Sequence, residues 1–345
     1  MELSRRNFVT GAAAVAAAAA VASTAPTAAK ADAAAAEEPK PDAGCLRICI
    51  SCNDLDRSRD FFCGQLEFTL VGEGILLEDV VEPLYGLPGK ARYAMVKNEY
   101  QATVLQLIEF EAKSGECIRT DENHGYDPGY FDVAVRCDEN YVVAKHLKKL
   151  GYTYYTEPYE YTAEWSGSTV SEAVLKGVDN VPTTMIMSIS EPRPEFDGLF
   201  KNITDIALVI SDVDRADLFW EGVLGMPKVY DEELEDGVVD PILGLPEGTH
   251  SRMIYYAGVN TPSVEALKFS VEGEQVTTAV PENAGIFALA YLADDVEAVA
   301  EKAKANGFNV RTAEPVESVI AVFGAVKSIM IDGPDGMIAE VFQRV

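Results

Sequence analysis

Six cysteines are the residues whose type and spacing most directly suggest chemistry, and all of them lie in the first half of the chain. Cys49 and Cys52 have the C-x-x-C spacing that is found in redox and zinc sites. They fall within a predicted strand, where residues three positions apart point to opposite faces, so they are not expected to share a metal ion. Free cysteine also packs as a small hydrophobic side chain. Two expectations stay open, buried thiols or one or two disulfides, among Cys45, Cys49, Cys52, Cys63, Cys117 and Cys137.

The amino terminus has the organisation of an export signal. Arg5 and Arg6 precede Asn-Phe-Val, and an alanine-rich apolar run follows from Gly11 to Ala22. This run is shorter than the roughly 20 apolar residues of a membrane-spanning helix, whereas a basic segment, a short apolar segment and small residues are typical of a cleavable signal. The paired arginines resemble the twin-arginine (Tat) signal. We predict a Tat-type signal peptide at 1–33, a linker at 34–44, and a mature protein that is secreted, periplasmic or on the cell surface, without a transmembrane segment.

The composition excludes some partners. The 345 residues include 28 Lys and Arg against 56 Asp and Glu, which gives a net charge of −28. Such an acidic surface repels phosphate backbones and anionic lipids, so nucleic-acid binding and membrane-surface roles are disfavoured. A small-molecule ligand or substrate is the expected partner.

A duplicated stretch organises the rest of the chain. Residues 54–66 (DLDRSRDFFCGQL) align with residues 212–224 (DVDRADLFWEGVL). The run VVEPLYGLP from Val80 aligns with VVDPILGLP from Val238, again at an offset of 158 residues. Two separate runs that agree on one offset indicate an internal duplication.

Each copy consists of two similar segments. In each segment a strand leads to an amphipathic helix, marked by an Asp before it or a glycine after it, and three further strands follow. We predict an α+β chain of four strand-helix-strand-strand-strand (βαβββ) modules, at 45–111, 129–190, 202–270 and 285–343. The Pro-rich joint at Glu191–Pro194 is expected to divide them into two domains, 45–195 and 196–345, each made of two consecutive modules.

These motifs resemble a known superfamily. The openings LRICISCNDLDRSRDFF and ITDIALVISDVDRADLFWEGVLGM, with the ending DGPDGMIAEVFQ, are similar to the vicinal oxygen chelate (VOC) superfamily of glyoxalases, extradiol dioxygenases, epimerases and bleomycin-resistance proteins. The resemblance covers residues 45 to 345. It implies that βαβββ modules pair into curved sheets, here two barrels, but it leaves the reaction open because a fold does not determine a function.

The resemblance also implies where functional residues should lie, because metal-dependent members carry His, Glu or Gln at inward-facing positions of the first and last strand of each module. In the first barrel the matching residues are Arg47, Gln106, Asp132 and Ser188. This mixed set does not make a metal site. An ion pair between Arg47 and Asp132 inside the barrel, or the binding of an anionic ligand, is expected instead.

In the second barrel the matching residues are Asp205, Glu265, Ala288 and Glu340. Converging carboxylates raise one another's pKa unless a cation or shared protons compensate. Three interpretations stay open. The cluster binds a hard divalent ion, with Mg²⁺, Mn²⁺ or Ca²⁺ favoured over Fe, Ni or Zn; one carboxyl with a raised pKa acts as the general base; or only Glu340 faces the interior.

No histidine occupies any of these eight positions. His124 falls in a linker, His146 on a helix surface and His250 near the start of a strand. A dioxygenase is therefore disfavoured, because non-haem iron uses two histidines and a carboxylate. The tyrosines of residues 152–161, beside Trp165, are expected to pack on a strand surface rather than to line a cavity.

These observations predict an exported glyoxalase-like VOC protein, monomeric or homodimeric. As an enzyme it would be an isomerase, epimerase or lyase that removes a proton beside a carbonyl group, with Glu340 as base or metal ligand and Asp205 and Glu265 assisting. The alternative is a non-catalytic protein that binds a small molecule, as the resemblance to bleomycin-resistance proteins implies.

Overall fold

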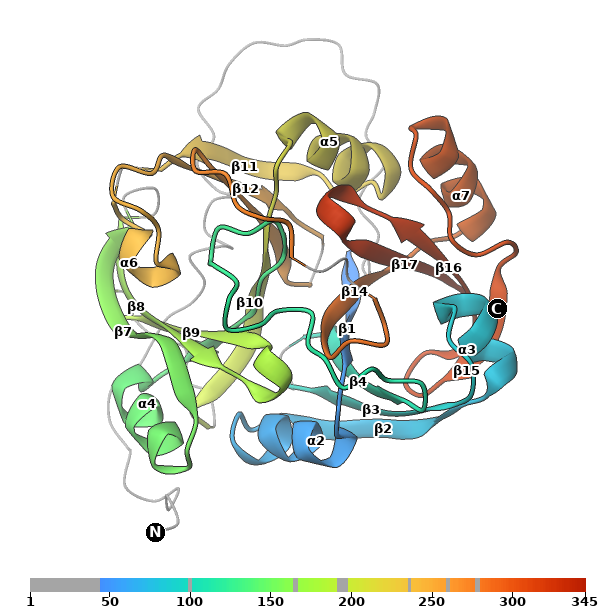
Figure 1. Ribbon diagram of the computed structural model, residues 1–345, viewed down its shortest axis with the longest axis horizontal. Coiled ribbons are helices and arrows are strands. Elements are labelled where there is room, and N and C mark those ends of the chain that lie inside the picture. Colours follow the sequence, from blue (N-terminus) through green and yellow to red (C-terminus); the bar gives the residue numbers. More distant parts are fainter. Residues whose placement is uncertain are drawn as a thin grey trace.

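The computed structural model describes residues 44–98, 101–163, 167–190, 198–234, 237–258, 261–276 and 280–345. The predicted signal peptide, nearly all of the predicted linker, the joint at Glu191–Pro194 and Trp165 lie outside these residues. The described chain contains the four predicted modules in order (Figure 1).

The first two modules follow the predicted strand and helix order. The first consists of β1 (Cys45–Ser51), α2 (Leu55–Gly64), β2 (Thr69–Leu76), α3 (Glu78–Tyr85), β3 (Ala91–Lys97) and β4 (Val104–Phe110). The second consists of β5 (Gly129–Tyr130), β6 (Val133–Cys137), α4 (Asn140–Lys149), β7 (Thr153–Ala163), β8 (Ser168–Lys176), the short helix η2 (Val178–Asn180) and β9 (Pro182–Ser188).

The last two modules repeat this order. The third consists of β10 (Phe200–Val209), α5 (Val213–Asp217), the π-helix η3 (Leu218–Val223), β11 (Lys228–Glu233), α6 (Asp240–Leu243), β12 (Ser251–Tyr256) and β13 (Ser263–Phe269). The fourth consists of β14 (Gly285–Leu292), α7 (Val296–Ala305), β15 (Val316–Ile320), β16 (Gly324–Asp332), the short helix η4 (Pro334–Gly336) and β17 (Ile338–Arg344).

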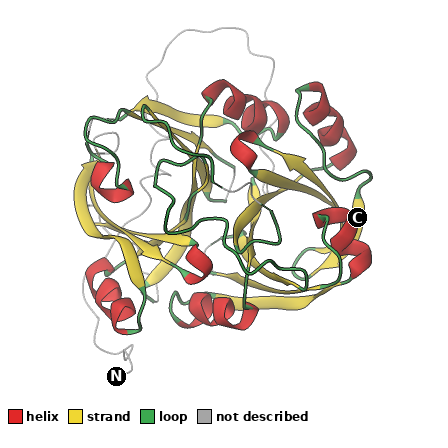
Figure 2. Ribbon diagram, viewed as in Figure 1, coloured by secondary structure: helices red, strands yellow, loops and turns green. Residues whose placement is uncertain are grey.

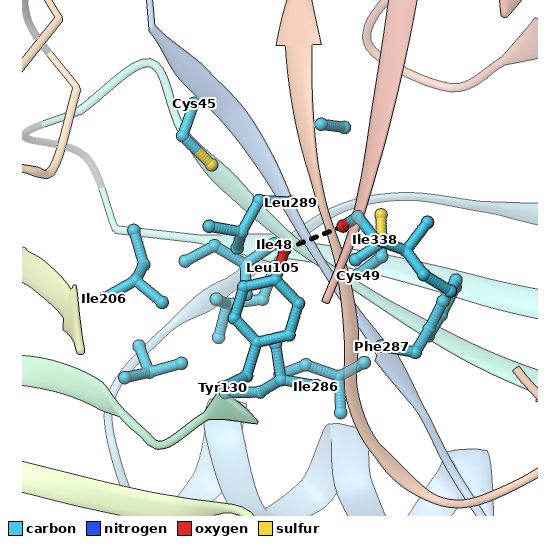
Figure 3. Packing of buried hydrophobic residues seen from close by; sticks show 14 of the residues in the cluster. Cys45, Ile48, Cys49, Leu105, Tyr130, Ile206, Ile286, Phe287, Leu289 and Ile338 are labelled. Atoms are coloured by element: carbon cyan, nitrogen blue, oxygen red, sulfur yellow. Dashed lines mark hydrogen bonds between the residues drawn. The ribbon is translucent and has the colours of Figure 1, made fainter. Parts of the chain in front are cut away.

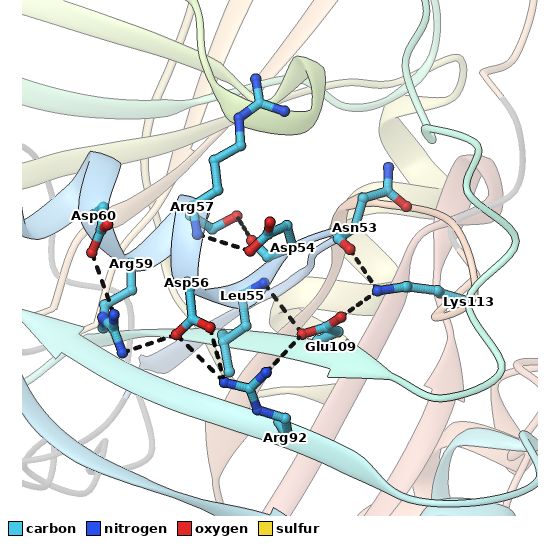
Figure 4. A network of polar contacts seen from close by, with 11 residues as sticks. Asn53, Asp54, Leu55, Asp56, Arg57, Arg59, Asp60, Arg92, Glu109 and Lys113 are labelled. Carbon is cyan, nitrogen blue, oxygen red and sulfur yellow. Dashed lines mark hydrogen bonds and ion pairs between the residues drawn. The ribbon is translucent and has the colours of Figure 1, made fainter.

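The duplicated motif begins a helix in the same way in both copies. Asp54 accepts a hydrogen bond from the backbone N–H of Arg57, and Asp212 accepts one from that of Arg215, which satisfies a donor that the helix leaves unpaired. In the first copy, charged side chains around α2 form a surface network that includes Arg59, Arg92, Glu109 and Lys113 (Figure 4). The matched runs thus fix the start of the module helix.

The strands of the described residues form two large curved sheets, with the helices on their outer sides (Figure 2). The eight-stranded sheet has the order β15-β16-β17-β14-β1-β4-β3-β2, and the nine-stranded sheet has the order β11-β12-β13-β10-β6-β9-β8-β7, with β5 beside β10. The eight-stranded sheet therefore joins the first and fourth modules, and the nine-stranded sheet joins the second and third.

This arrangement corrects the predicted pairing of consecutive modules within 45–195 and 196–345. In every module the first strand lies parallel to the last, so its free edge pairs with the first strand of another module. That partner is β14 for β1 and β6 for β10, in both cases antiparallel. Because all four modules present an equivalent edge, the sequence pattern allows either pairing, and only the three-dimensional arrangement selects between them.

The two sheets share one hydrophobic core. Ile48 and Leu289 of the eight-stranded sheet and Ile206 of the nine-stranded sheet belong to the same cluster of buried residues (Figure 3). The hydroxyl of Tyr130, from β5, donates a 2.7 Å hydrogen bond to the carbonyl oxygen of Ile338 in β17. The sheets are thus packed against each other rather than held by a linker alone.

The six cysteines, all within the described residues, are free thiols. Cys45, Cys49, Cys52 and Cys137 are buried, and Cys63 and Cys117 are partly buried. Burial raises the pKa of the Cys45 and Cys52 thiols to about 12, so neither forms the reactive thiolate at neutral pH. Of the two expectations, the structure has the buried thiols. None of the described helices has both the length and the apolarity that a membrane crossing would require.

We predict that the native protein protects most of its thiols. With a thiol-specific chromogenic reagent under non-denaturing conditions, no more than two groups should react quickly, Cys63 and Cys117, and all six should react in denaturant, because only unfolding exposes the buried strand cysteines. Fewer than six reactive groups in denaturant without reductant would reveal a disulfide and contradict this structure.

Candidate functional site

The structure separates the residues that were predicted to converge. Arg47, Gln106 and Glu340 lie together in the eight-stranded sheet, on β1, β4 and β17. Asp132, Ser188, Asp205 and Glu265 line one cavity in the nine-stranded sheet. A site made of Asp205, Glu265 and Glu340 is therefore wrong, and so is the pairing of Arg47 with Asp132, because both combine residues of different sheets.

Arg47 lies between two buried side chains that accept its hydrogen bonds. Its Nη1 donates to Oε1 of Gln106 at 2.5 Å, and its Nη2 donates to Oε1 of Glu340 at 2.7 Å. All three side chains are fully buried. The sheet register explains the meeting, because Ala290 of β14 lies directly between Arg47 and Glu340 on the neighbouring strands and its small side chain leaves the space open.

Aromatic rings cover this ion pair. The guanidinium carbon of Arg47 lies 4.6 Å from the ring centre of Phe342 and 5.5 Å from that of Phe323. A guanidinium over an aromatic face is stabilised electrostatically, most strongly where water is excluded. The interior of the eight-stranded sheet thus contains its own cation, and its one buried carboxylate of the predicted set is already neutralised.

We predict that Arg47→Met destabilises the protein strongly. The substitution leaves Glu340 as a buried charge without its partner, which costs about 3–5 kcal/mol in comparable cases. The free energy of unfolding, measured with urea, should fall by that amount. The double variant Arg47→Met/Glu340→Leu removes both charges and should recover most of the loss. If Arg47→Met alone is as stable as the wild type, Arg47 is not needed to compensate the buried charge of Glu340.

The nine-stranded sheet encloses a cavity of about 130 Å³. Four carboxyl side chains line it: Asp132 directly before β6, Glu172 on β8, Asp205 on β10 and Glu265 on β13. Arg136 is the one Lys or Arg among its lining residues. Aromatic residues complete much of the wall, namely Phe131, Tyr161, Tyr230 and Tyr255. We call this space the carboxylate cavity.

Asp205 and Glu265 lie on the neighbouring parallel strands β10 and β13, and each affects the pKa of the other. Burial raises the pKa of Asp205 to about 6, although hydrogen bonds from Thr204 and from protonated Glu265 oppose the shift. Burial and the nearby Asp205 raise the pKa of Glu265 well above its ordinary value. Because both pKa values are raised and each acid affects the other, the two carboxyls ionise in separate steps and can hold one proton between them.

Asp132 and Glu172 are shifted in the same direction. Burial, with the charge of Asp205, raises the pKa of Asp132 to about 7. Burial raises the pKa of Glu172 to about 8, against the hydrogen bond that it accepts from the hydroxyl of Tyr161 at 2.8 Å. The hydroxyl of Thr184 donates to Oδ2 of Asp132, whereas Oδ1 of Asp132 is buried and has no hydrogen-bond partner.

Glu172 and Tyr255 were missed by the sequence analysis. Glu172 lies on a middle strand of its module, away from the first and last strands that the resemblance indicated. A signal for Tyr255 was present, because the hairpin of residues 251–269 places it directly opposite Glu265, and its hydroxyl lies 3.1 Å from Oε1 of that residue. Most tyrosines of residues 152–161 pack as predicted, but Tyr161 lines the cavity.

The histidines contribute no ligand to the carboxylate cavity, since neither His124, His146 nor His250 lines it. Ala288, the remaining predicted position, is buried in β14 beside Cys49. Ser188 lies on the wall of the cavity, at the end of β9.

Comparisons with known proteins identify similar sequences and similar folds. Residues 202–341 match the glyoxalase, bleomycin resistance protein and dioxygenase superfamily, and residues 2–22 match the signal sequence of the twin-arginine translocation pathway. Residues 202–341 are thus similar to a domain of this superfamily. Its fold is similar to that of a single-residue variant of glyoxalase I from Zea mays, with 18% identity and a TM-score of 0.57 over 87% of this chain and 92% of that one.

A second structure of Zea mays glyoxalase I gives a TM-score of 0.55 at 18% identity, over 87% of this chain and 92% of the other. A comparison with curated protein sequences found no match. The expected α+β fold of two curved sheets is thus confirmed, and it is similar to the fold of glyoxalase I. The match to a Tat signal sequence indicates that the protein is exported and has an extracytoplasmic location.

The superfamily resemblance implies a metal site, but the described residues do not fit one. No group of three or more His, Cys, Asp or Glu side chains is arranged so that it could hold a metal ion among them. In the eight-stranded sheet the guanidinium of Arg47 already neutralises Glu340. The four acids of the carboxylate cavity point inward from separate strands instead of meeting at one point, so we derive no catalytic step through a metal.

We predict that the carboxylate cavity makes the protein less stable as the pH rises. The four acids have raised pKa values in the folded state, so the folded protein retains protons that the unfolded chain has released. Their contribution to stability is therefore present near pH 4 and is lost as the pH rises towards 8. Glu265→Gln keeps the shape of the acid without its charge and should raise the free energy of unfolding at pH 8 by at least about 1 kcal/mol, the value of one pKa unit.

Denaturant unfolding at pH 5 and pH 8 measures this effect, with Asp214→Asn on the exposed face of α5 as the matched control. The gain from Glu265→Gln should be smaller at pH 5 than at pH 8, and Asp214→Asn should change little at either. An equal gain at both pH values would show that relief of charge burial is not the cause.

Proposed function

We propose that this exported protein is an isomerase, epimerase or lyase that moves a proton at the carbon beside a carbonyl group, and that the carboxylate cavity is its active site. The observation that carries the proposal is the Asp205–Glu265 pair. Two buried carboxyls on neighbouring strands, each with a raised pKa and each affecting the other, can hold one proton between them, and such a pair can supply a base and an acid in one site.

The chemistry of the pair follows from its charges. The carboxylate of Asp205 takes the proton from the carbon beside the carbonyl, and the electron pair of the broken C–H bond forms the C=C bond of an enol. The carbonyl π electrons move to oxygen, which receives the proton of Glu265. No oxidant or reductant is needed, because the step only moves protons and electron pairs within the substrate.

The fate of the enol separates the three reaction types. If the deprotonated carbon bears a hydroxyl group, that hydroxyl loses its proton to become the new carbonyl while the former carbonyl carbon gains a proton, which gives an isomer. Return of a proton to the same carbon from the opposite face gives an epimer, and loss of a substituent with its bonding electrons from the next carbon gives a lyase product. Tyr255 supports the acid, because its hydroxyl lies 3.1 Å from Oε1 of Glu265 and holds the orientation of that carboxyl group.

We assign the role of the base to Asp205, whereas the sequence analysis favoured Glu340. Glu340 is fully buried and shares an ion pair with Arg47, so it has neither access to a substrate nor a free charge. The alternative function, non-catalytic binding of a small molecule, uses the same cavity and differs only in the absence of proton transfer.

We predict that the mature protein exchanges carbon-bound protons of its substrate with solvent. Small aldehydes, ketones and 2-oxo acids, with and without an amino group, are incubated in D₂O, and proton NMR follows the loss of the signal beside the carbonyl. Asp205→Asn should slow exchange by about 100-fold or more, within the usual range for loss of a general base. The rate should rise with pH through about 6, where Asp205 ionises, and fall again when Glu265 loses its proton.

The exposed Asp214→Asn variant is the control for this experiment and should exchange at the wild-type rate. Loss of exchange in Glu340→Gln, with exchange retained in Asp205→Asn, would place the active site in the eight-stranded sheet. Binding of a carbonyl compound without any exchange would favour the non-catalytic alternative.

A further inference from the structure

The carboxylate cavity has more negative than positive charge in its wall. Asp132, Glu172, Asp205 and Glu265 line it, against the single guanidinium of Arg136. Arg119 also acts on Asp132, but it lies outside the cavity, with its Nε and Nη2 donating to the backbone carbonyls of Tyr130 and Asp127. Burying several acids around one arginine is costly unless protons or a bound cation compensate them.

Asp132 provides an independent sign of a missing partner. The residue is 3% exposed, and it lines the cavity. Its Oδ2 accepts from Thr184, whereas its Oδ1 is buried without any hydrogen-bond partner. A buried acceptor without a donor costs about 1–3 kcal/mol, so a ligand with an N–H donor would bind favourably at this atom.

The rest of the wall suits an organic cation better than a bare metal ion. Tyr161 and Tyr255 direct their hydroxyl groups to Glu172 and Glu265, so that their rings form part of the lining. Tyr230 packs against Tyr255 with ring centres 5.8 Å apart. Aromatic faces attract alkylammonium groups and give a metal ion no ligands, and oxygen-ligated metals need several carboxylates meeting at one point.

The volume of the cavity suits a small ligand. The cavity of about 130 Å³ is similar to the roughly 150 Å³ space that admits benzene in an engineered protein core. A ligand of a few carbon atoms with one ammonium group satisfies the size, the charge and the aromatic lining together.

We propose that the ligand of the carboxylate cavity is a small organic ammonium compound, whose N–H groups donate to Asp132 Oδ1 and whose positive charge is balanced by Glu172. The inference names the substrate class of the active site proposed above and rests on that proposal only for its catalytic meaning. If the protein is an enzyme that acts beside a carbonyl group, a ligand of this class makes its substrate a small amino aldehyde, amino ketone or related amino carbonyl compound.

Binding of simple probes tests this without any need for turnover. Butylammonium, butanol and butyrate have similar size and differ in charge, and isothermal titration calorimetry at pH 7.5 compares them. Butylammonium should bind at least tenfold more tightly than butanol, and butyrate should not bind. Titration in buffers of different ionisation enthalpy should show proton release on binding, because the cation draws protons from Asp132 and Glu172.

Two variants connect the binding to the cavity. Asp132→Asn and Glu172→Gln should each weaken butylammonium binding by tenfold or more, and both should fold, because the amides resemble the protonated acids. The exposed Asp214→Asn variant should bind as the wild type does. Mg²⁺, Mn²⁺ and Ca²⁺ are titrated in parallel and should not displace the probe at similar concentrations.

Equal affinity for butanol and butylammonium would overturn the inference, as would unchanged binding in Asp132→Asn. Divalent ions that bind where butylammonium does not would also overturn it and would make the cavity a metal site. The result is separable from the proposed function. Cation binding without proton exchange in any carbonyl compound removes the enzyme proposal alone, and exchange confined to compounds without an ammonium group removes the present inference alone.

Discussion

A carboxylate inside a curved sheet needs a compensating charge or a proton, and this requirement explains how the two halves of the molecule differ. Water cannot solvate these groups as it does at the surface, so the charged form of each acid is unfavourable unless a partner lies beside it. The chain meets this requirement in two ways on two sheets built from the same type of module. One sheet supplies a cation from its own sequence, and the other retains protons.

In the eight-stranded sheet the cation is Arg47. Its guanidinium lies between Gln106 and Glu340, with the rings of Phe323 and Phe342 over it. An arginine fits this role because its planar group donates in several directions at once and its long side chain fills space. The polar interior of this sheet is thereby occupied. In the nine-stranded sheet the one guanidinium of the wall, that of Arg136, lies among four acids, and a cavity remains.

Much of the fold follows from the sequence, whereas the grouping of site residues does not. The four modules and the helix starts at Asp54 and Asp212 are local features, set by periodicity and capping. The pairing of β1 with β14 and of β10 with β6 is not local, because a duplicated chain offers equivalent edges to more than one partner. With the observed pairing, Glu340 lies beside Arg47, and Asp132 lines the same cavity as Asp205. Each of these residues nevertheless lies in or directly beside the strand that was predicted for it. Single positions could thus be predicted correctly while the sites they form could not.

The raised pKa values also explain how the carboxylate cavity is compatible with export. A Tat signal directs a chain that folds before it crosses the membrane, so the cavity must be stable in the folded protein without relying on a ligand met only outside. Protons fulfil this need, because Asp132 and Glu172, with pKa values of about 7 and about 8, can be neutral in the empty cavity. A cation that enters later replaces those protons and gains the full charge of the acids. The same groups therefore permit folding in the absence of ligand and attraction of a cation in its presence, which a permanent internal partner such as Arg47 would prevent.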